Sequence, residues 1–240
     1  CSPCHNGNGV ATTSVEKGHG VYEHWLWPLF AKENAQAGCQ TCHAADMVRA
    51  GLAGSIRDYP LWTYRDLTLP LERIDYGGQP AGYASQPSEV VNYVENHDNQ
   101  TLFDVNAFKL PVDTSREDRT RVQILGAALV AFSQGVAYFH AGMDTLRSKS
   151  MDGNSYDSGD WFNRVDWSYR DNYFGSGLPP EADNGGNWSL MRPLLANPAI
   201  KPAAANIAWT RDAFRDLLKI RALAGVDKIC GAHAIARALF

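Results

Sequence analysis

The feature that most constrains the fold is a short, mainly apolar run that is followed by a polar His-Asp-Asn turn. Val90 to Glu95 predicts a short buried strand, and after Asn96 come His97, Asp98 and Asn99. Residues 101–108 then have the apolar spacing of a helix. Barrel enzymes place the side chains of their sites at the ends of strands, so this order predicts a site at His97 and Asp98.

Other segments predict further helices and one further strand. Residues 116–132 carry apolar side chains at helical spacing and acidic residues in the first turn, and residues 212–221 form a second amphipathic pattern. Shorter helices are predicted at residues 22–30 and 45–52, and a strand at residues 135–139. Strands that alternate with helices of this size predict the α/β class.

Composition limits the classes of partner. A chain of 240 residues with 45% hydrophobic residues can bury a sizeable core. The formal net charge is −4 and the charges of both signs are interleaved, so nothing indicates nucleic acid or an anionic membrane surface as a partner. No apolar run approaches the about 20 residues of a spanning helix, and we expect no membrane span. Aromatic residues beside Asn, Asp and Gly in residues 154–188 suit sugar rings.

Two Cys-x-x-Cys-His motifs precede these segments. In such a motif two thiols can add to the vinyl groups of a haem while the histidine binds its iron. Residues 1–44 therefore resemble a fragment of a c-type cytochrome, with one or two haem c groups expected. The attachment residues would be Cys1, Cys4, His5, Cys39, Cys42 and His43, with His5 and His43 as the iron ligands.

The cysteines leave other interpretations open. The four motif cysteines could instead bind zinc, and Cys1 could carry a lipid. His19, His24 and Met47 are all candidates for the distal iron ligand. Use of the haem motifs would place the protein in the periplasm or outside the cell. The sequence begins without Met, so either a signal has been removed or it starts inside a longer protein.

Three blocks of sequence carry a resemblance to a known family. They are Ala45 to Asp58, Asn92 to Leu102, and Leu146 to Ser150 followed by Asn154 to Asp166. Residues 45–221 thereby resemble the later part of the catalytic barrel of pullulanase-type debranching enzymes, in glycoside hydrolase family 13, the α-amylase superfamily. The resemblance implies the last strands and helices of a (β/α)8 TIM barrel. The expected domains are residues 1–44, a small irregular or helical segment with the CxxCH motifs, residues 45–221, and an unassigned Ala-rich tail at 222–240.

The family resemblance implies roles for particular residues. Asp98 would stabilise an oxocarbenium-like transition state, and His97 would donate a hydrogen bond to the sugar. Asn99 would support them, and the loop residues Asn154, Asp157 and Asp160 would line the cleft. The implied substrates are the α-1,6 branch linkages of α-glucans such as pullulan, limit dextrin or glycogen-like polymers.

The sequence departs from the family in two respects. Gly153 stands where the relatives usually carry Arg. A retaining glycosidase also needs a nucleophile and a general acid about 5 Å apart. The family carries them in motifs resembling Gly-Phe-Arg-Phe-Asp and Gly-Glu-Gly-Trp, and neither occurs among the 240 residues. We therefore expect no hydrolysis by this chain alone, with the other half of the barrel needed for activity.

Two alternative interpretations follow from the same sequence. If the CxxCH motifs are used, the chain could be a haem-binding electron-transfer protein. It could also be a chimeric reading frame, joined from pieces of two genes and without an integrated function.

Overall fold

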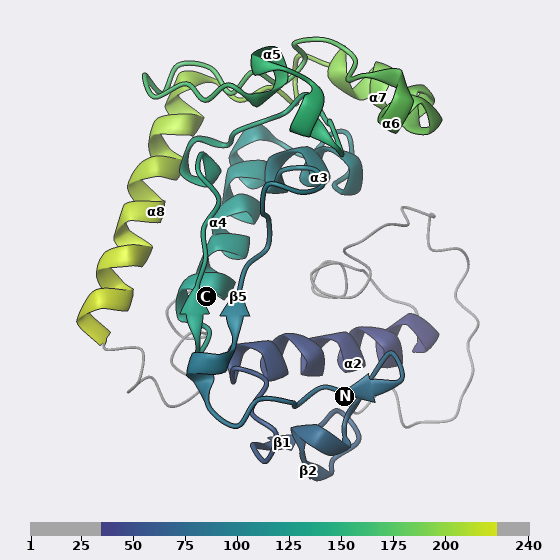
Figure 1. The fold of residues 1–240 in the computed structure, drawn as a ribbon, viewed down its shortest axis with the longest axis vertical. Coiled ribbons are helices and arrows are strands. Elements are labelled where there is room, and N and C mark those ends of the chain that lie inside the picture. Colours follow the sequence, from purple (N-terminus) through teal and green to yellow (C-terminus); the bar gives the residue numbers. More distant parts are fainter. Residues whose placement is uncertain (1–34, 225–240) are drawn as a thin grey trace. The chain divides into compact units, whose positions relative to one another are not determined.

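The structure, a computed structural model, describes residues 35–224 (Figure 1). These residues form two compact units. The first unit contains residues 35–92 and 132–136, and the second contains residues 93–131 and 137–224. None of the helices in the described part of the chain is long and apolar enough to cross a membrane.

The first unit is built from one long helix and short strands. Helix α2 spans Ala35–Leu52. Strands β1 (Pro60–Trp62) and β2 (Thr68–Pro70) pair antiparallel, as do β3 (Asp75–Tyr76) and β4 (Gln79–Pro80). The 3-10 turns η3 (Leu71–Arg73) and η4 (Pro87–Glu89) and strand β5 (Val91–Asn92) complete the described elements of this unit.

The core of the first unit lies between α2 and the segments that follow it. Met47 and Ala50 of α2 pack with apolar side chains of the strands and turns, namely Leu61, Leu71, Ile74 and Ala81. Gly82 permits a close approach there, because a Cβ at this position would lie 2.5 Å from the Cβ of Leu71. A side chain at residue 82 would therefore force the backbone apart.

The second unit is mainly helical. Its longer helices are α3 (Leu102–Lys109), α4 (Arg116–Phe132), α7 (Trp188–Leu195) and α8 (Ala204–Ala224). The shorter elements are β6 (Val136–Ala137), η5 (Met143–Thr145), η6 (Ser155–Asp157), α5 (Asp160–Asn163), α6 (Glu181–Asn184) and η7 (Gly185–Asn187). Strand β6 pairs with β5, where the Val136 N–H donates to the carbonyl of Val90 at 2.8 Å. Residues 132–136 are the last residue of α4, the turn after it and the first residue of β6. They belong to the first unit, so this hydrogen bond lies within that unit.

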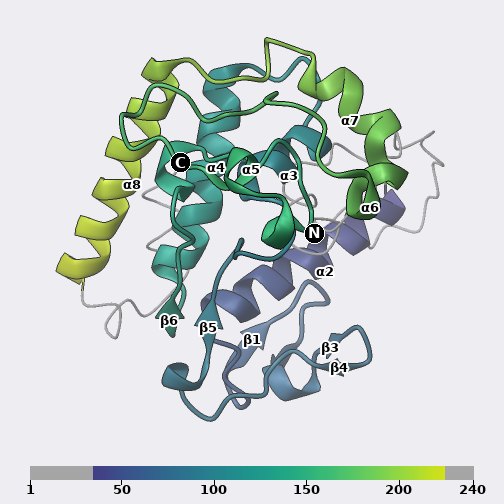
Figure 2. The same cartoon turned by 45° about the horizontal axis from the view of Figure 1, so that its top comes forward.

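Helix α3 packs against α7, and Figure 2 shows α6 leading into α7 in the same unit. The buried core around this contact contains Phe103, Ala107, Leu146, Met151, Phe174, Met191, Ile200 and Ile207. The rings of Phe103 and Phe174 meet edge to face, with centroids 5.5 Å apart. This core joins α3 to the long loop that follows β6.

Polar side chains fix the start of α3. The hydroxyl of Thr101 accepts a hydrogen bond from the Asp104 N–H and caps the helix. The buried carboxylate of Glu95 accepts from the Leu102 N–H. Asp104 is fully buried and accepts from the Ser148 hydroxyl and, at 2.7 Å, from the Lys149 N–H. The first turn of α3 therefore holds residues 148 and 149.

The predicted helices are largely confirmed. Helix α4 has the predicted bounds, 116–132, and α3 lies one residue later than predicted. The helix predicted at 212–221 lies within the longer α8, and that predicted at 45–52 is the end of α2. The helix predicted at 22–30 lies outside the described residues.

The predicted strands are too long. The strand predicted at 90–95 pairs only at Val91–Asn92, and that predicted at 135–139 only at Val136–Ala137. Glu95 is buried as a hydrogen-bond acceptor for the start of α3 and not as a member of a sheet. Three two-stranded sheets are seen among residues 35–224 and no closed barrel, so the predicted barrel is not confirmed.

The stability of the second unit should depend on the charge of Asp104. Burial raises the pKa of its carboxyl from 3.8 to about 6, although the hydrogen bonds from Ser148 and Lys149 oppose this change. Between these two pH values the folded chain binds more protons than the unfolded chain, so the free energy of unfolding falls as the pH rises through this window. The difference between the two pKa values corresponds to roughly 3 kcal/mol.

Asp104→Asn should remove this fall, which urea unfolding at pH 4 to 7, followed by tryptophan fluorescence, would measure. The exposed Asp113 provides the control, because Asp113→Asn should keep the pH dependence of the wild type. Equal pH dependence in wild type and Asp104→Asn would contradict the assignment.

Candidate functional site

A pocket of about 160 Å³ lies in the second unit at the turn that follows β5. Two of the residues around it, His97 and Asp98, come from that turn. The others come from the segment after β6 and from the loop that contains η6 and α5. The full lining consists of His97, Asp98, His140, Arg147, Lys149, Asn154, Ser155, Tyr156 and Asn163.

His97 and Asp98 lie side by side at this pocket. The Nε2 of His97 is 3.4 Å from the Oδ1 of Asp98, and the two side chains are 79% and 67% exposed. The backbone turns sharply here: the Asp98 N–H donates to the Oδ1 of Asn96 at 2.8 Å, and Asn99 adopts a left-handed φ of 60°. Asn tolerates that conformation better than most residues. The turn therefore exposes an imidazole and a carboxylate, side by side, to solvent.

The buried Lys149 side chain fixes the backbone of this turn. Its ammonium donates to the carbonyl of His97 at 2.8 Å, and the residue is only 2% exposed. Burial, and then the charge of Arg147, lower the pKa of Lys149. Since the backbone N–H of Lys149 is bonded to Asp104, one residue connects the start of α3 to the turn at His97.

Three ionisable side chains lie close together beside Lys149. The Nδ1 of His140 is 3.6 Å from the Oε1 of the buried Glu95, and the Nε2 of His140 is 3.4 Å from the Nη1 of Arg147. Arg147 also donates to the carbonyls of Ala141 and Asn163, and its burial lowers the pKa of the guanidinium. A mostly buried network of ionisable side chains thus lies beneath the exposed His-Asp pair.

Hydrogen bonds between side chains and backbone fix the loop across the pocket. The Nδ2 of Asn163 donates to the carbonyl of Ser155 at 2.7 Å, and the Asn154 N–H donates to the Oδ1 of Asp152 at 2.9 Å. Tyr156 is 85% exposed and Asn154 is exposed as well. These two side chains therefore face solvent from a loop whose backbone is held by internal hydrogen bonds.

Gly153 lies in the same loop. Its N–H donates to the Oδ1 of Asn184 at 2.9 Å. A Cβ at this position would come within 2.7 Å of the Nε2 of Gln100, so the amide of Gln100 occupies the space beside the glycine. Because that atom is the end of a flexible side chain, a larger residue at 153 would be accommodated by a shift of Gln100.

The structure brings some of the predicted site residues together. His97, Asp98 and Asn154 share the pocket, whereas Asn99, Asp157 and Asp160 are exposed but do not line it. The roles of all six residues remain predictions. The predicted site residues did not include Glu95, His140, Arg147 or Lys149, which the structure places at or beside this pocket. Arg147 and Lys149 lie in the block Leu146–Ser150 that carried the family resemblance, but their burial was not visible from the pattern.

The proposed haem ligands are mostly outside what the structure describes. Cys1, Cys4 and His5 precede the described residues, and Cys39 and Cys42 lie in α2 with their side chains undescribed. His43 is described, and its ring lies edge-on to that of Tyr64 with centroids 6.0 Å apart. Among the described residues no group of three or more His, Cys, Asp or Glu could hold a metal ion. Haem c and zinc both remain predictions.

Comparisons with known proteins give one consistent result. The family model for alpha-1,6-glucosidases, pullulanase-type, C-terminal, matches residues 169–239. The match continues past residue 221, where the resemblance was expected to end. The chain is 42% identical over 193 residues to "Pullulanase 1, chloroplastic" of Arabidopsis thaliana, covering 80% of this chain and 20% of that protein. It is 39% identical over 182 residues to the pullulanase of Klebsiella pneumoniae, covering 76% and 17%.

Solved structures agree with the sequence relatives. Apo pullulanase from Klebsiella pneumoniae superposes with a TM-score of 0.73 at 38% identity, covering 76% of this chain and 20% of that one. The pullulanase of the same organism complexed with maltotriose has the same TM-score and covers 76% and 17%. These matches give the cytochrome resemblance of residues 1–44 no support. The chain spans about a fifth of the length of these relatives, and it is homologous to pullulanases over about four fifths of its own.

Proposed function

We propose that this chain carries the sugar-binding and transition-state-stabilising part of a pullulanase-type site that acts on α-1,6 branch linkages of α-glucans. The observation that supports the proposal most directly is the exposed His97–Asp98 pair beside Asn154 at one pocket. The homology to pullulanases supports the class of reaction.

In this proposal Asp98 acts on a sugar ring that gains positive charge during cleavage. Its carboxylate accepts hydrogen bonds from ring hydroxyls, and these bonds strengthen as the oxocarbenium character develops. His97 donates a hydrogen bond to the same sugar. Lys149 and the buried Glu95 keep the turn in place, so that the pair needs little reorganisation when the ligand binds.

Further contacts with the glucan would come from Asn99, Asn154, Asp157 and Asp160. The bound sugars would be α-glucans, as in pullulan, limit dextrin or glycogen-like polymers. The Klebsiella pneumoniae pullulanase has been solved with maltotriose, which supports a linear α-glucan product as a ligand for this site.

The reaction also needs a nucleophile and a general acid. Segments resembling Gly-Phe-Arg-Phe-Asp and Gly-Glu-Gly-Trp do not occur in the 240 residues. We propose that residues 45–221 correspond to the last strands and helices of a (β/α)8 barrel, and that cleavage requires the strands that carry the other two carboxylates.

Maltotriose binding tests the role of the pair. Asp98→Asn should weaken the binding of maltotriose about tenfold, since a charged hydrogen-bond acceptor for hydroxyls is replaced by a neutral one. Isothermal titration calorimetry would measure the dissociation constant. Asp113→Asn, at an exposed site elsewhere in the second unit, is the matched control and should bind as the wild type does. Equal binding by the wild type and Asp98→Asn would refute the proposed role of Asp98.

Hydrolysis provides an independent test. The purified chain should release no maltotriose from pullulan, because the two bond-breaking carboxylates of a retaining glycosidase are not both present. Chromatography of the sugars after a long incubation would detect slow cleavage. Release above that of a heat-inactivated sample would show that other carboxylates of this chain perform the reaction.

Haem attachment is a separate proposal based on the two CxxCH motifs. After co-expression with a cytochrome-maturation system, the pyridine haemochrome spectrum should show covalent haem c. Cys39→Ser with Cys42→Ser should remove the haem of the second motif. An unmodified mass and no haem absorbance in the wild type would rule the proposal out.

A further inference from the structure

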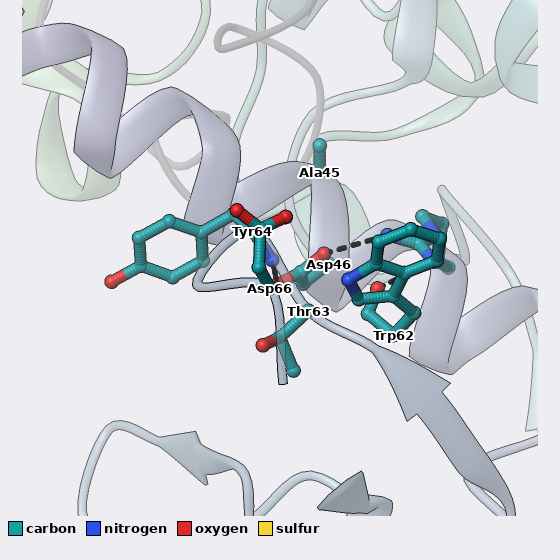
Figure 3. Close-up of a pocket in the computed structure, with 7 residues that line it drawn as sticks. Ala45, Asp46, Trp62, Thr63, Tyr64 and Asp66 are labelled. Atoms are coloured by element: carbon teal, nitrogen blue, oxygen red, sulfur yellow. Dashed lines mark hydrogen bonds and ion pairs between the residues drawn. The ribbon is translucent and has the colours of Figure 1, made fainter. Parts of the chain in front are cut away.

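A second and larger pocket lies in the first unit, between α2 and the hairpin of β1 and β2. Its volume is about 300 Å³, at the lower end of the range of small-molecule sites. Asp46 and Arg49 of α2 line it together with Trp62 at the end of β1 and Asp66 in the turn between the strands (Figure 3). Nothing in the proposed function uses these residues.

Hydrogen bonds fix the backbone around this pocket. The Nη1 of Arg49 donates to the Oδ1 of Asp46 at 2.8 Å, and its Nη2 donates to the carbonyl of Trp62 at 2.7 Å. The other oxygen of Asp46, which is only 2% exposed, accepts from the Tyr64 N–H at 2.9 Å. The helix and the hairpin are thereby joined through one buried carboxylate, and these hydrogen bonds fix the rim of the pocket.

The indole of Trp62 is left in solvent at this fixed position. Leu61 points into the core and is 4% exposed, so the alternation of the strand directs Trp62 outward, where it is 64% exposed. Figure 3 shows the indole on one side of Asp46 and the phenol of Tyr64 on the other. A large aromatic face that is held in water beside a pocket is a typical surface for a ligand.

The polar groups select the class of ligand. The charge of Arg49 is balanced by Asp46, while the exposed carboxylate of Asp66 has no hydrogen-bond partner among the described residues. Two carboxylates against one guanidinium disfavour a phosphate or another anion. A neutral sugar fits better, because its ring offers an apolar face to the indole and hydroxyls to Arg49 and Asp66.

We infer that this pocket is a second α-glucan-binding site, which takes a glucose residue against Trp62 and performs no chemistry. The identity of the ligand as an α-glucan rests on the proposed function, whereas the existence of the site rests on the geometry of the first unit. Such a site would hold a long polymer in addition to the contact at His97 and Asp98.

Affinity electrophoresis of the 240-residue chain in native gels with increasing pullulan tests this inference. Trp62→Ala should raise the dissociation constant for pullulan about tenfold, the loss expected for one stacked aromatic contact together with its buried area. Trp62→Phe should restore part of the affinity because it keeps an aromatic face. Trp209→Ala is the matched control, since Trp209 is 47% exposed on α8 and should not affect binding.

The Asp98→Asn variant separates this inference from the proposed function. If pullulan still retards Asp98→Asn but retards Trp62→Ala less, the second site is supported. If retardation is lost in Asp98→Asn alone, pullulan binds only at the first site and the inference of a second site is overturned. Equal retardation of Trp62→Ala and wild type also overturns it, as does a wild type that pullulan does not retard. Melting of each variant, followed by circular dichroism, distinguishes a lost contact from a lost fold. If Trp62→Ala melts at a lower temperature than the wild type and Trp62→Phe does not restore binding, the result counts against the site.

Discussion

The buried carboxylate of Asp104 is the interaction on which the proposed active site depends. It accepts from the Ser148 hydroxyl and the Lys149 N–H, and it thereby fixes the segment after β6 to the first turn of α3. Lys149 in turn donates to the carbonyl of His97. Because a buried carboxylate is costly without such partners, Asp104 and its donors stabilise one another, and the orientation of the His97–Asp98 turn follows from them.

The pocket at that turn combines the exposed His97–Asp98 pair with buried ionisable side chains beneath it. An exposed His-Asp contact adds little to stability, so its geometry must be maintained by the groups beneath it. Glu95 serves the start of α3 with one oxygen and faces His140 with the other, and Arg147 connects His140 to the loop across the pocket. The exposed groups that would contact a sugar, His97 and Asp98, are therefore positioned by buried groups that would not contact it.

The sequence predicted the helices better than the strands. Helix α4 could be located from its apolar spacing and acidic first turn, since both signals are local. The strand predicted at 90–95 was too long, because an apolar run does not show where pairing ends, and Glu95 turned out to accept from the Leu102 N–H. For the site, the order strand, His97, Asp98, helix was visible, whereas Arg147 and Lys149 come from about fifty residues later and only folding brings them to the same pocket.

The sequence by itself determined the helical segments, the His-Asp-Asn turn and the homology to pullulanases. Each of these depends on residues that are close together along the chain. Tertiary structure alone decided which distant groups support that turn. It also decided that Trp62 stays exposed beside Asp46 and Arg49, since the pairing of β1 with β2 and the hydrogen bonds to Asp46 arise only when the hairpin packs on α2. Hydrogen bonds and packing between segments that are far apart in the sequence leave no local pattern, so they could not be predicted from it.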